Sequence, residues 1–284
     1  MGAMSGSYWR NVVAEDFEVP ADRGLDDLTA ELTRMLGSTD PDVRDGTAYP
    51  ALATWTERGV YDDLLSGLGD GMAAGLAVGL GDNGTDSVFR RSFSVLILGE
   101  CLARDNATAL LPGAKILEWG DRVATWYLRE RDLRGYVSGK GWAHAVAHGA
   151  DALGALAASP HLYTNELTVL LDVLADRLSL TDDVVLTAGE PDRMAAATMA
   201  ILRRNLVPLR VIEPWISRVV GVSQQKSVAG QDPFLATGNA QAFLRSLYLQ
   251  LSLAPAPPDV RSDLLLVLVD ALRVTNPAYL ASRS

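Results

Sequence analysis

Two of the three histidines in the chain lie close to a carboxylate, in a short segment that otherwise consists mainly of small apolar residues. His144, His148 and Asp151 are separated by four and by three positions. On a helix these spacings place side chains on one face, so we expect the two imidazoles and the carboxylate to lie together. The segment is therefore a candidate active site.

Two kinds of chemistry fit this set of side chains. In the first, His144 or His148 acts as a general base and Asp151 orients its imidazole. In the second, all three bind a divalent metal, because imidazole nitrogens and a carboxylate are common ligands of zinc and iron. A structural interpretation, in which the histidines only hydrogen-bond neighbouring helices, stays open as well. No cofactor is certain, and a divalent metal is the one candidate.

Several residues around the histidines are candidates for holding a substrate. The guanidinium groups of Arg91 and Arg134 offer a fixed fork for carboxylate, sulfate or phosphate. Tyr136 and Trp142 offer flat rings, and Lys140 precedes a helix start whose free N–H groups favour an anion. The alternatives are structural: Arg91 as a buried arginine inside a helical repeat, Trp142 as a core side chain, and Arg134 as the partner of a nearby aspartate.

The elements that must position these residues are helices, because nearly every apolar segment follows the helical spacing and strand-like alternation is scarce. A loop is predicted from Ser223 to Gly238. The predicted helices are Asp26–Leu36, Arg44–Arg58, Tyr61–Leu80, Ser87–Arg104, Pro112–Arg129, Gly141–Ala158, Asn165–Leu178, Asp192–Arg204, Pro208–Val220, Asn239–Leu253 and Asp259–Val274.

A short repeat suggests how these helices are arranged. Pro41-Asp42-Val43-Arg44 recurs as Pro258-Asp259-Val260-Arg261, and Asp86-Ser87-Val88-Phe89-Arg90 resembles the same helix start. The two full copies are separated by five steps of about 43 residues, which is typical of HEAT repeats. We therefore predict an all-α, HEAT-like α-solenoid of about five to six helix pairs. A compact helical toroid or bundle is the alternative.

Composition limits the classes of function. A net charge of −10 in 284 residues excludes nucleic-acid binding, which needs clustered Lys and Arg. No apolar run is long enough to span a membrane. Cys101 is the single cysteine, so we expect a reducing, cytoplasmic setting. Residues 1–7 look like an expression-tag remnant, and residues 8–284 are predicted to form a single domain.

Two glycine-containing segments resemble nucleotide-binding motifs without meeting their requirements. Gly67, Gly69 and Gly71 form a Gly-x-Gly-x-Gly run, but no strand precedes them as the dinucleotide fingerprint requires. Ser138-Gly139-Lys140-Gly141 resembles the end of a phosphate loop, but position 134 is Arg where the upstream glycine belongs. Neither segment predicts a nucleotide site.

Most of the chain resembles the bacterial domain-of-unknown-function 2785 family. The resemblance implies a helical fold, and it implies no mechanism because the family has no assigned activity. The segments that carry it are 91–94 (RSFS), 130–136 (ERDLRGY), 141–151 (GWAHAVAHGAD), Asn239, 243–248 (FLRSLY) and Asn276-Pro277.

Two functions of different classes follow. The first is a small-molecule enzyme or ligand-binding protein of bacterial metabolism, with His144, His148 and Asp151 as an acid–base or metal centre and with arginines that hold an anionic small molecule. The alternative is a non-catalytic helical-repeat scaffold that binds a partner enzyme and completes its active site. Solenoids suit the second function because stacked repeats present extended surfaces.

Overall fold

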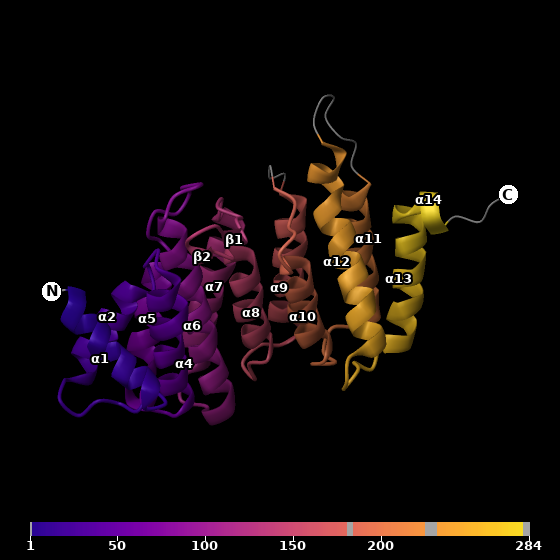
Figure 1. Cartoon of the computed structure of the whole chain (residues 1–284). Coiled ribbons are helices and arrows are strands. Elements are labelled where there is room, and N and C mark those ends of the chain that lie inside the picture. Colours follow the sequence, from indigo (N-terminus) through magenta and orange to yellow (C-terminus); the bar gives the residue numbers. More distant parts are fainter. Residues whose placement is uncertain (1, 181–183, 225–231, 281–284) are drawn as a thin grey trace.

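The chain folds into two layers of helices that stack pair after pair along one direction (Figure 1). The computed structural model describes residues 2–180, 184–224 and 232–280. The all-α, solenoid-like fold expected from the sequence is confirmed. The first layer contains α4 (Tyr49–Glu57), α6 (Ser87–Thr108), α8 (Ala145–Ala157), α10 (Glu190–Leu202) and α12 (Pro233–Leu253), each packed on the next. The second layer contains α5 (Leu65–Gly75), α7 (Gly113–Arg129), α9 (Thr164–Ser179), α11 (Leu209–Ser223) and α13 (Arg261–Thr275).

Further elements complete the two ends and one edge of the stack. The N-terminal end holds α1 (Gly2–Ala14), α2 (Leu25–Met35), α3 (Pro41–Val43), the π-helical η1 (Arg44–Ala48) and the 3-10 turn η2 (Asp62–Leu64). The C-terminal end of the described chain holds α14 (Pro277–Leu280). A hairpin of β1 (Tyr136–Val137) and β2 (Gly141–Trp142) is inserted between α7 and α8.

Hydrogen bonds between neighbouring helix pairs fix the stacking. Arg104 donates two hydrogen bonds to Asp62, 42 positions earlier, at 2.7 and 2.8 Å. Trp215 Nε1 donates to the carbonyl oxygen of Leu171, 44 positions earlier, at 2.7 Å. Contacts at such regular separations are what a nearest-neighbour repeat architecture produces.

The core lies between the two layers and is built from amphipathic helices. In α7, the buried residues Ile116, Trp119, Val123 and Trp126 recur every three or four positions. That spacing forms one apolar face, and burial of each such side chain contributes about 1.5–3 kcal/mol. The single cysteine, Cys101, is fully buried on α6, and burial raises the pKa of its thiol.

Several predicted boundaries are wrong. The helix predicted over Tyr61–Leu80 ends at Gly75. The helix predicted from Gly141 begins at Ala145, because Gly141 and Trp142 pair with β1. The loop predicted from Ser223 to Gly238 is shorter, since α12 begins at Pro233, where the Asp232 side chain accepts a hydrogen bond from the N–H of Phe234 at 2.9 Å. Asp232 is thus an N-cap that the helical periodicity did not reveal. The part of this prediction on residues 225–231 lies outside the described residues.

The register of the predicted repeat also needs correction. Pro41 begins the helical segment that leads into α4 of the first layer, whereas Arg261 begins α13 of the second layer. The two copies therefore stand at non-equivalent positions, although both segments start helices. First-layer helices after α4 begin at Ser87, Ala145, Glu190 and Pro233. The longest separation between two of these helix starts contains the hairpin. The repeat is therefore irregular at the point where the hairpin is inserted.

The N-terminal helix α1 begins at Gly2, inside the segment assigned to a tag remnant, and contributes Trp9 and Val12 to the core. The assignment of residues 1–7 to a remnant and the single-domain boundary stay predictions. No helix in the described ranges is long and apolar enough to cross a membrane.

The glycines of α5 provide a matched test of the packing between α5 and α7, two neighbouring helices of the second layer. A methyl group at Gly69 would overlap the ring of Trp119, whereas one at Gly71 would meet open space. We expect Gly69→Ala to lower the free energy of unfolding by about 1–3 kcal/mol through overpacking. Gly71→Ala should raise it by about 0.5–1 kcal/mol, because alanine is the better helix former. Urea denaturation measures both, and equal effects would contradict the observed packing of α5.

Candidate functional site

The two histidines stand at the start of α8, but only one is inside the helix. His144 occupies the N-cap position with a left-handed backbone (φ 51°). His148 lies in the first turn, and its N–H donates to the carbonyl oxygen of His144 at 3.0 Å. The expected common helix face is therefore replaced by a different arrangement, in which the two rings make an edge contact with centroids 5.6 Å apart.

His148 is almost completely enclosed. Ser92 Oγ donates to the carbonyl oxygen of Ala143, so its lone pair accepts a hydrogen bond from Nδ1 of His148 at 2.8 Å. Phe93 packs against the ring edge-on at a centroid distance of 5.1 Å. Burial lowers the pKa of His148 to about 3, so the imidazole is neutral at pH 7. A base this weak is poorly suited to proton abstraction near neutral pH.

His144 is held between the hairpin and the loop before α10. Its Nε2 donates to the carbonyl oxygen of Ala188 at 2.9 Å and lies 3.7 Å from Glu190 Oε1. The Trp142 ring stacks on its imidazole, with a centroid distance of 4.6 Å and an interplanar angle of 23°. In neutral His144, these contacts leave Nδ1 as a hydrogen-bond acceptor.

Asp151 does not join the histidines. Both of its carboxylate oxygens accept hydrogen bonds from Arg193 of α10, the one from Nε at 2.6 Å. Within the described ranges, no three His, Cys, Asp or Glu side chains are close enough to hold a metal ion. The residues present therefore do not fit the proposed metal site, because the carboxylate that should complete it is paired with a neighbouring repeat.

Arg91 is structural, which corrects its assignment as an anion holder. It is fully buried, and its Nε and Nη2 donate to the buried carboxylate of Glu130 at 2.6 and 2.8 Å. Its Nη1 donates to the carbonyl oxygens of Val78 and Gly79 and to Ser87 Oγ. All its nitrogens are thus used inside the stack, and none is free for a ligand.

Arg134 and Lys140 are also engaged within the protein. Arg134 donates through Nε and Nη2 to the buried Asp132, at 2.8 and 2.7 Å, and to the carbonyl oxygen of Thr85. Lys140 Nζ binds Asp86 at 2.6 Å, and the first-turn residues of α8 are buried. The anion site expected at Arg134 and at the start of α8 is therefore not formed.

The hairpin carries the exposed aromatic rings. In its register Tyr136 faces Trp142, and their rings meet edge-on at 5.1 Å. The exposed fractions are 63% for Tyr136 and 41% for Trp142, so Trp142 is not the core side chain of the structural alternative. We call Tyr136, Trp142 and His144 the aromatic edge.

Arg44 holds the turn of the hairpin in place. Its Nη2 donates to the carbonyl oxygen of Lys140 at 2.7 Å and to Asp45 at 2.6 Å, while its guanidinium lies over the ring of Phe93. Gly141 has a positive φ of 78°, and a side chain there would collide with Arg44. The turn of the hairpin is consequently held in place by Arg44.

Sequence reasoning missed the residues that organise this edge. Ser92 stands in the RSFS segment singled out above, but its bond to His148 depends on how α6 and α8 stack. Two glycines around Lys140 were a turn signal that could have predicted the hairpin. No sequence signal identified Arg193 or Glu190 as partners of the candidate residues.

The described chain is thus a two-layer α-solenoid with an aromatic hairpin at one edge. A model of the family described as "Protein of unknown function (DUF2785)" matches residues 76–249, and the chain belongs to that family. The match includes the hairpin and both histidines. No curated protein and no solved structure matches the chain.

Proposed function

We propose that the protein is a non-catalytic α-solenoid that binds a basic segment of a partner protein through its aromatic edge. The observation that carries the proposal is the exposed Trp142 ring, stacked on a fixed imidazole. Tyr and Trp dominate the binding energy of protein interfaces because they bury a large area with little loss of conformational freedom.

The chemistry of the edge favours a cationic partner side chain. An Arg or Lys lying on the Trp142 face gains a cation–π interaction. Nδ1 of His144 has no partner among the described residues and accepts a hydrogen bond in the neutral imidazole. The net charge of −10 attracts a basic partner over longer distances. We place this interaction in the bacterial cytoplasm, because the single cysteine of the chain is a buried free thiol.

Cross-linking from defined positions tests this proposal. A photoreactive benzoylphenylalanine in place of Tyr136 should give a discrete protein adduct in cells that naturally contain the protein. The same replacement at Val169, which is exposed on α9, should not give it. Trp142→Ala should remove the adduct at position 136, because the platform for the basic side chain is lost. The same adduct from both positions, or no adduct at position 136, would refute the proposal.

A second candidate is an acid–base enzyme in which His144 is the base. The observation in its favour is the left-handed backbone of His144, since strained conformations of non-glycine residues concentrate at active sites. In this function Trp142 would hold a planar substrate beside Nδ1. The first proposal is stronger because Asp151, Arg91 and Arg134 are all paired inside the protein.

A further inference from the structure

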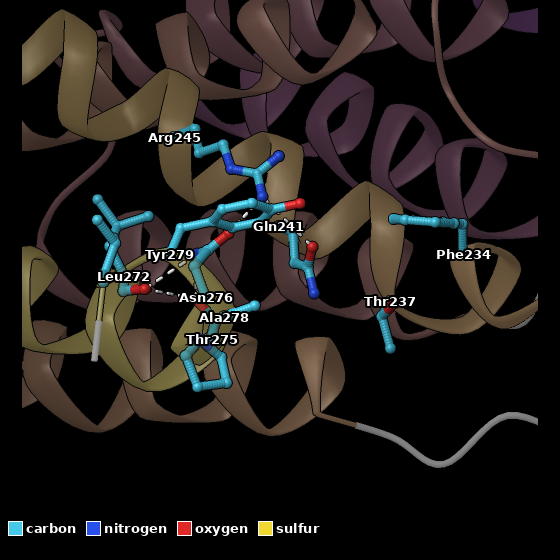
Figure 2. A pocket seen from close by; sticks show the side chains of 11 residues that line it. Phe234, Thr237, Gln241, Arg245, Leu272, Thr275, Asn276, Ala278 and Tyr279 are labelled. Atoms are coloured by element: carbon cyan, nitrogen blue, oxygen red, sulfur yellow. Dashed lines mark hydrogen bonds between the residues drawn. The ribbon is translucent and has the colours of Figure 1, made fainter. Parts of the chain in front are cut away.

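A cavity of about 770 Å³ lies at the C-terminal end of the described stack, apart from the aromatic edge. Figure 2 shows side chains that line it. It is open to solvent and forms where the first half of α12 meets the end of α13 and α14. Phe234 and Thr237 lie on one side of it, and Arg245, Tyr279 and Asn276 gather on the other, as Figure 2 shows. Its size is within the usual range for small-molecule sites.

The cavity has an unusual charge for this protein. Arg245 is the one charged side chain among the described residues that line the cavity, although the chain as a whole carries a net charge of −10. Its Nη2 donates to neutral amide oxygens, those of Asn276 and, at 3.5 Å, Gln241. Nε and Nη1 of Arg245 have no partner among the described residues. Arg104, by contrast, is neutralised by the two oxygens of a carboxylate.

The guanidinium is also oriented. Asn276 Nδ2 donates to the carbonyl oxygen of Leu272 at 2.9 Å and to Thr275 Oγ1 at 3.0 Å. These bonds fix the amide so that its oxygen faces Arg245. A pre-positioned guanidinium with free N–H groups suits a carboxylate, which accepts charge-assisted hydrogen bonds.

The rest of the lining is largely apolar. Phe234, Leu272 and Tyr279 contribute rings and an aliphatic side chain, and Ala278 and Leu280 extend this surface. A ligand that fills the cavity therefore needs an apolar body as well as a negative charge.

We propose that this cavity binds a small organic carboxylate with an aromatic or aliphatic body. Arg245 holds the carboxylate, and Phe234, Leu272 and Tyr279 cover the apolar part. The inference is independent of the partner-binding function, because the aromatic edge contributes no residue to the cavity. The proposed anion site lies at Arg245. The sequence had predicted an anion site at Arg91 and Arg134 instead.

Calorimetry with three probes tests the ligand class. 3-Phenylpropanoate should bind with a dissociation constant of about 0.1–1 mM, a usual affinity for a ligand of its size. The uncharged 3-phenylpropanamide should bind at least about 10-fold more weakly, because it lacks the charge-assisted hydrogen bonds. Acetate should bind more weakly as well, since it has almost no apolar body. The proposal would be overturned by equal affinities for all three probes. It would also be overturned if 3-phenylpropanoate did not bind at 10 mM, which is about 10 times the weakest dissociation constant expected.

Variants then locate the site. Arg245→Gln should weaken 3-phenylpropanoate binding at least about 10-fold. Arg273→Gln removes the same charge from exposed Arg273 of α13, outside the cavity lining, and should change nothing. Phe234→Glu is the second test, because it places a repelling carboxylate at an exposed position without disturbing any buried group. Equal effects of Arg245→Gln and Arg273→Gln, or normal binding by Phe234→Glu, would refute the site.

Trp142→Ala should leave the affinity for 3-phenylpropanoate unchanged. This variant therefore distinguishes failure of the partner-binding function from failure of the carboxylate site.

Discussion

Arg91→Met is expected to lower the free energy of unfolding by about 3–5 kcal/mol, the largest stability effect of any single change considered. Methionine fills a similar space but leaves the carboxylate of Glu130 buried without its main partner. It also removes the donor for two carbonyl oxygens, those of Val78 and Gly79. Chemical denaturation followed by circular dichroism measures the loss.

The control for this result is Arg122→Met. Arg122 forms an exposed ion pair with Glu118, in which Nη2 and Oε1 are 3.2 Å apart. Exposed pairs contribute little, so a change within about 0.5 kcal/mol is expected. If Arg91→Met were as mild as this control, Arg91 would not be part of the framework, and its assignment as an anion holder would have to be restored.

His148 should make the protein less stable in acid. Its pKa is lowered to about 3 by burial, against about 6.5 in an unfolded chain. Below pH 6.5 the unfolded state therefore binds a proton that the folded state does not. The stabilising effect of keeping His148 neutral is complete above pH 6.5 and is lost progressively as the pH falls from 6.5 towards 3. The loss should approach about 1.4 kcal/mol for each pH unit.

This contribution can be separated from that of the carboxylates with a variant. His148→Asn keeps an N–H donor for Ser92 but cannot take up a proton. The fall in unfolding free energy between pH 7.5 and 4.5 should be smaller in this variant than in the natural protein by about 2–3 kcal/mol. His161→Asn, at the third histidine, serves as the control. Identical pH profiles for His148→Asn and the natural protein would show that His148 titrates normally and is not enclosed.

The helices were predictable because their apolar positions repeat with a local period. The apolar face of α7, with Trp119 and Val123, needs no information from distant residues. The hairpin was missed because the Ala-rich segment after Gly141 reads as helix, although the glycines around Lys140 mark a turn. The contact of Arg44 with the Lys140 carbonyl, which holds this turn, involves residues 96 positions apart and has no local sequence signal.

The proximity of the two histidines was predictable, but their partners were not. The spacing of His144 and His148 predicted that their side chains lie together, and the two rings are in contact. Their role in a functional site stays a prediction. The partners depend on which helices stack, since Arg193 is 42 positions from Asp151, and Glu130 is 39 positions from Arg91. A single sequence holds no signal for such pairings. The side chains that look catalytic in isolation form hydrogen bonds and ion pairs within the protein instead.

The complete burial of Cys101 has a consequence for how motions of the solenoid can be followed in solution. This thiol is the single cysteine of the chain and lies on α6, the second helix of the first layer. A thiol reagent reaches it only when α6 separates from its neighbours, so the labelling rate counts those openings directly. In a stack of repeats, such openings differ from one end to the other. The natural protein therefore reports the local opening rate of the repeat that contains α6 without any engineered label.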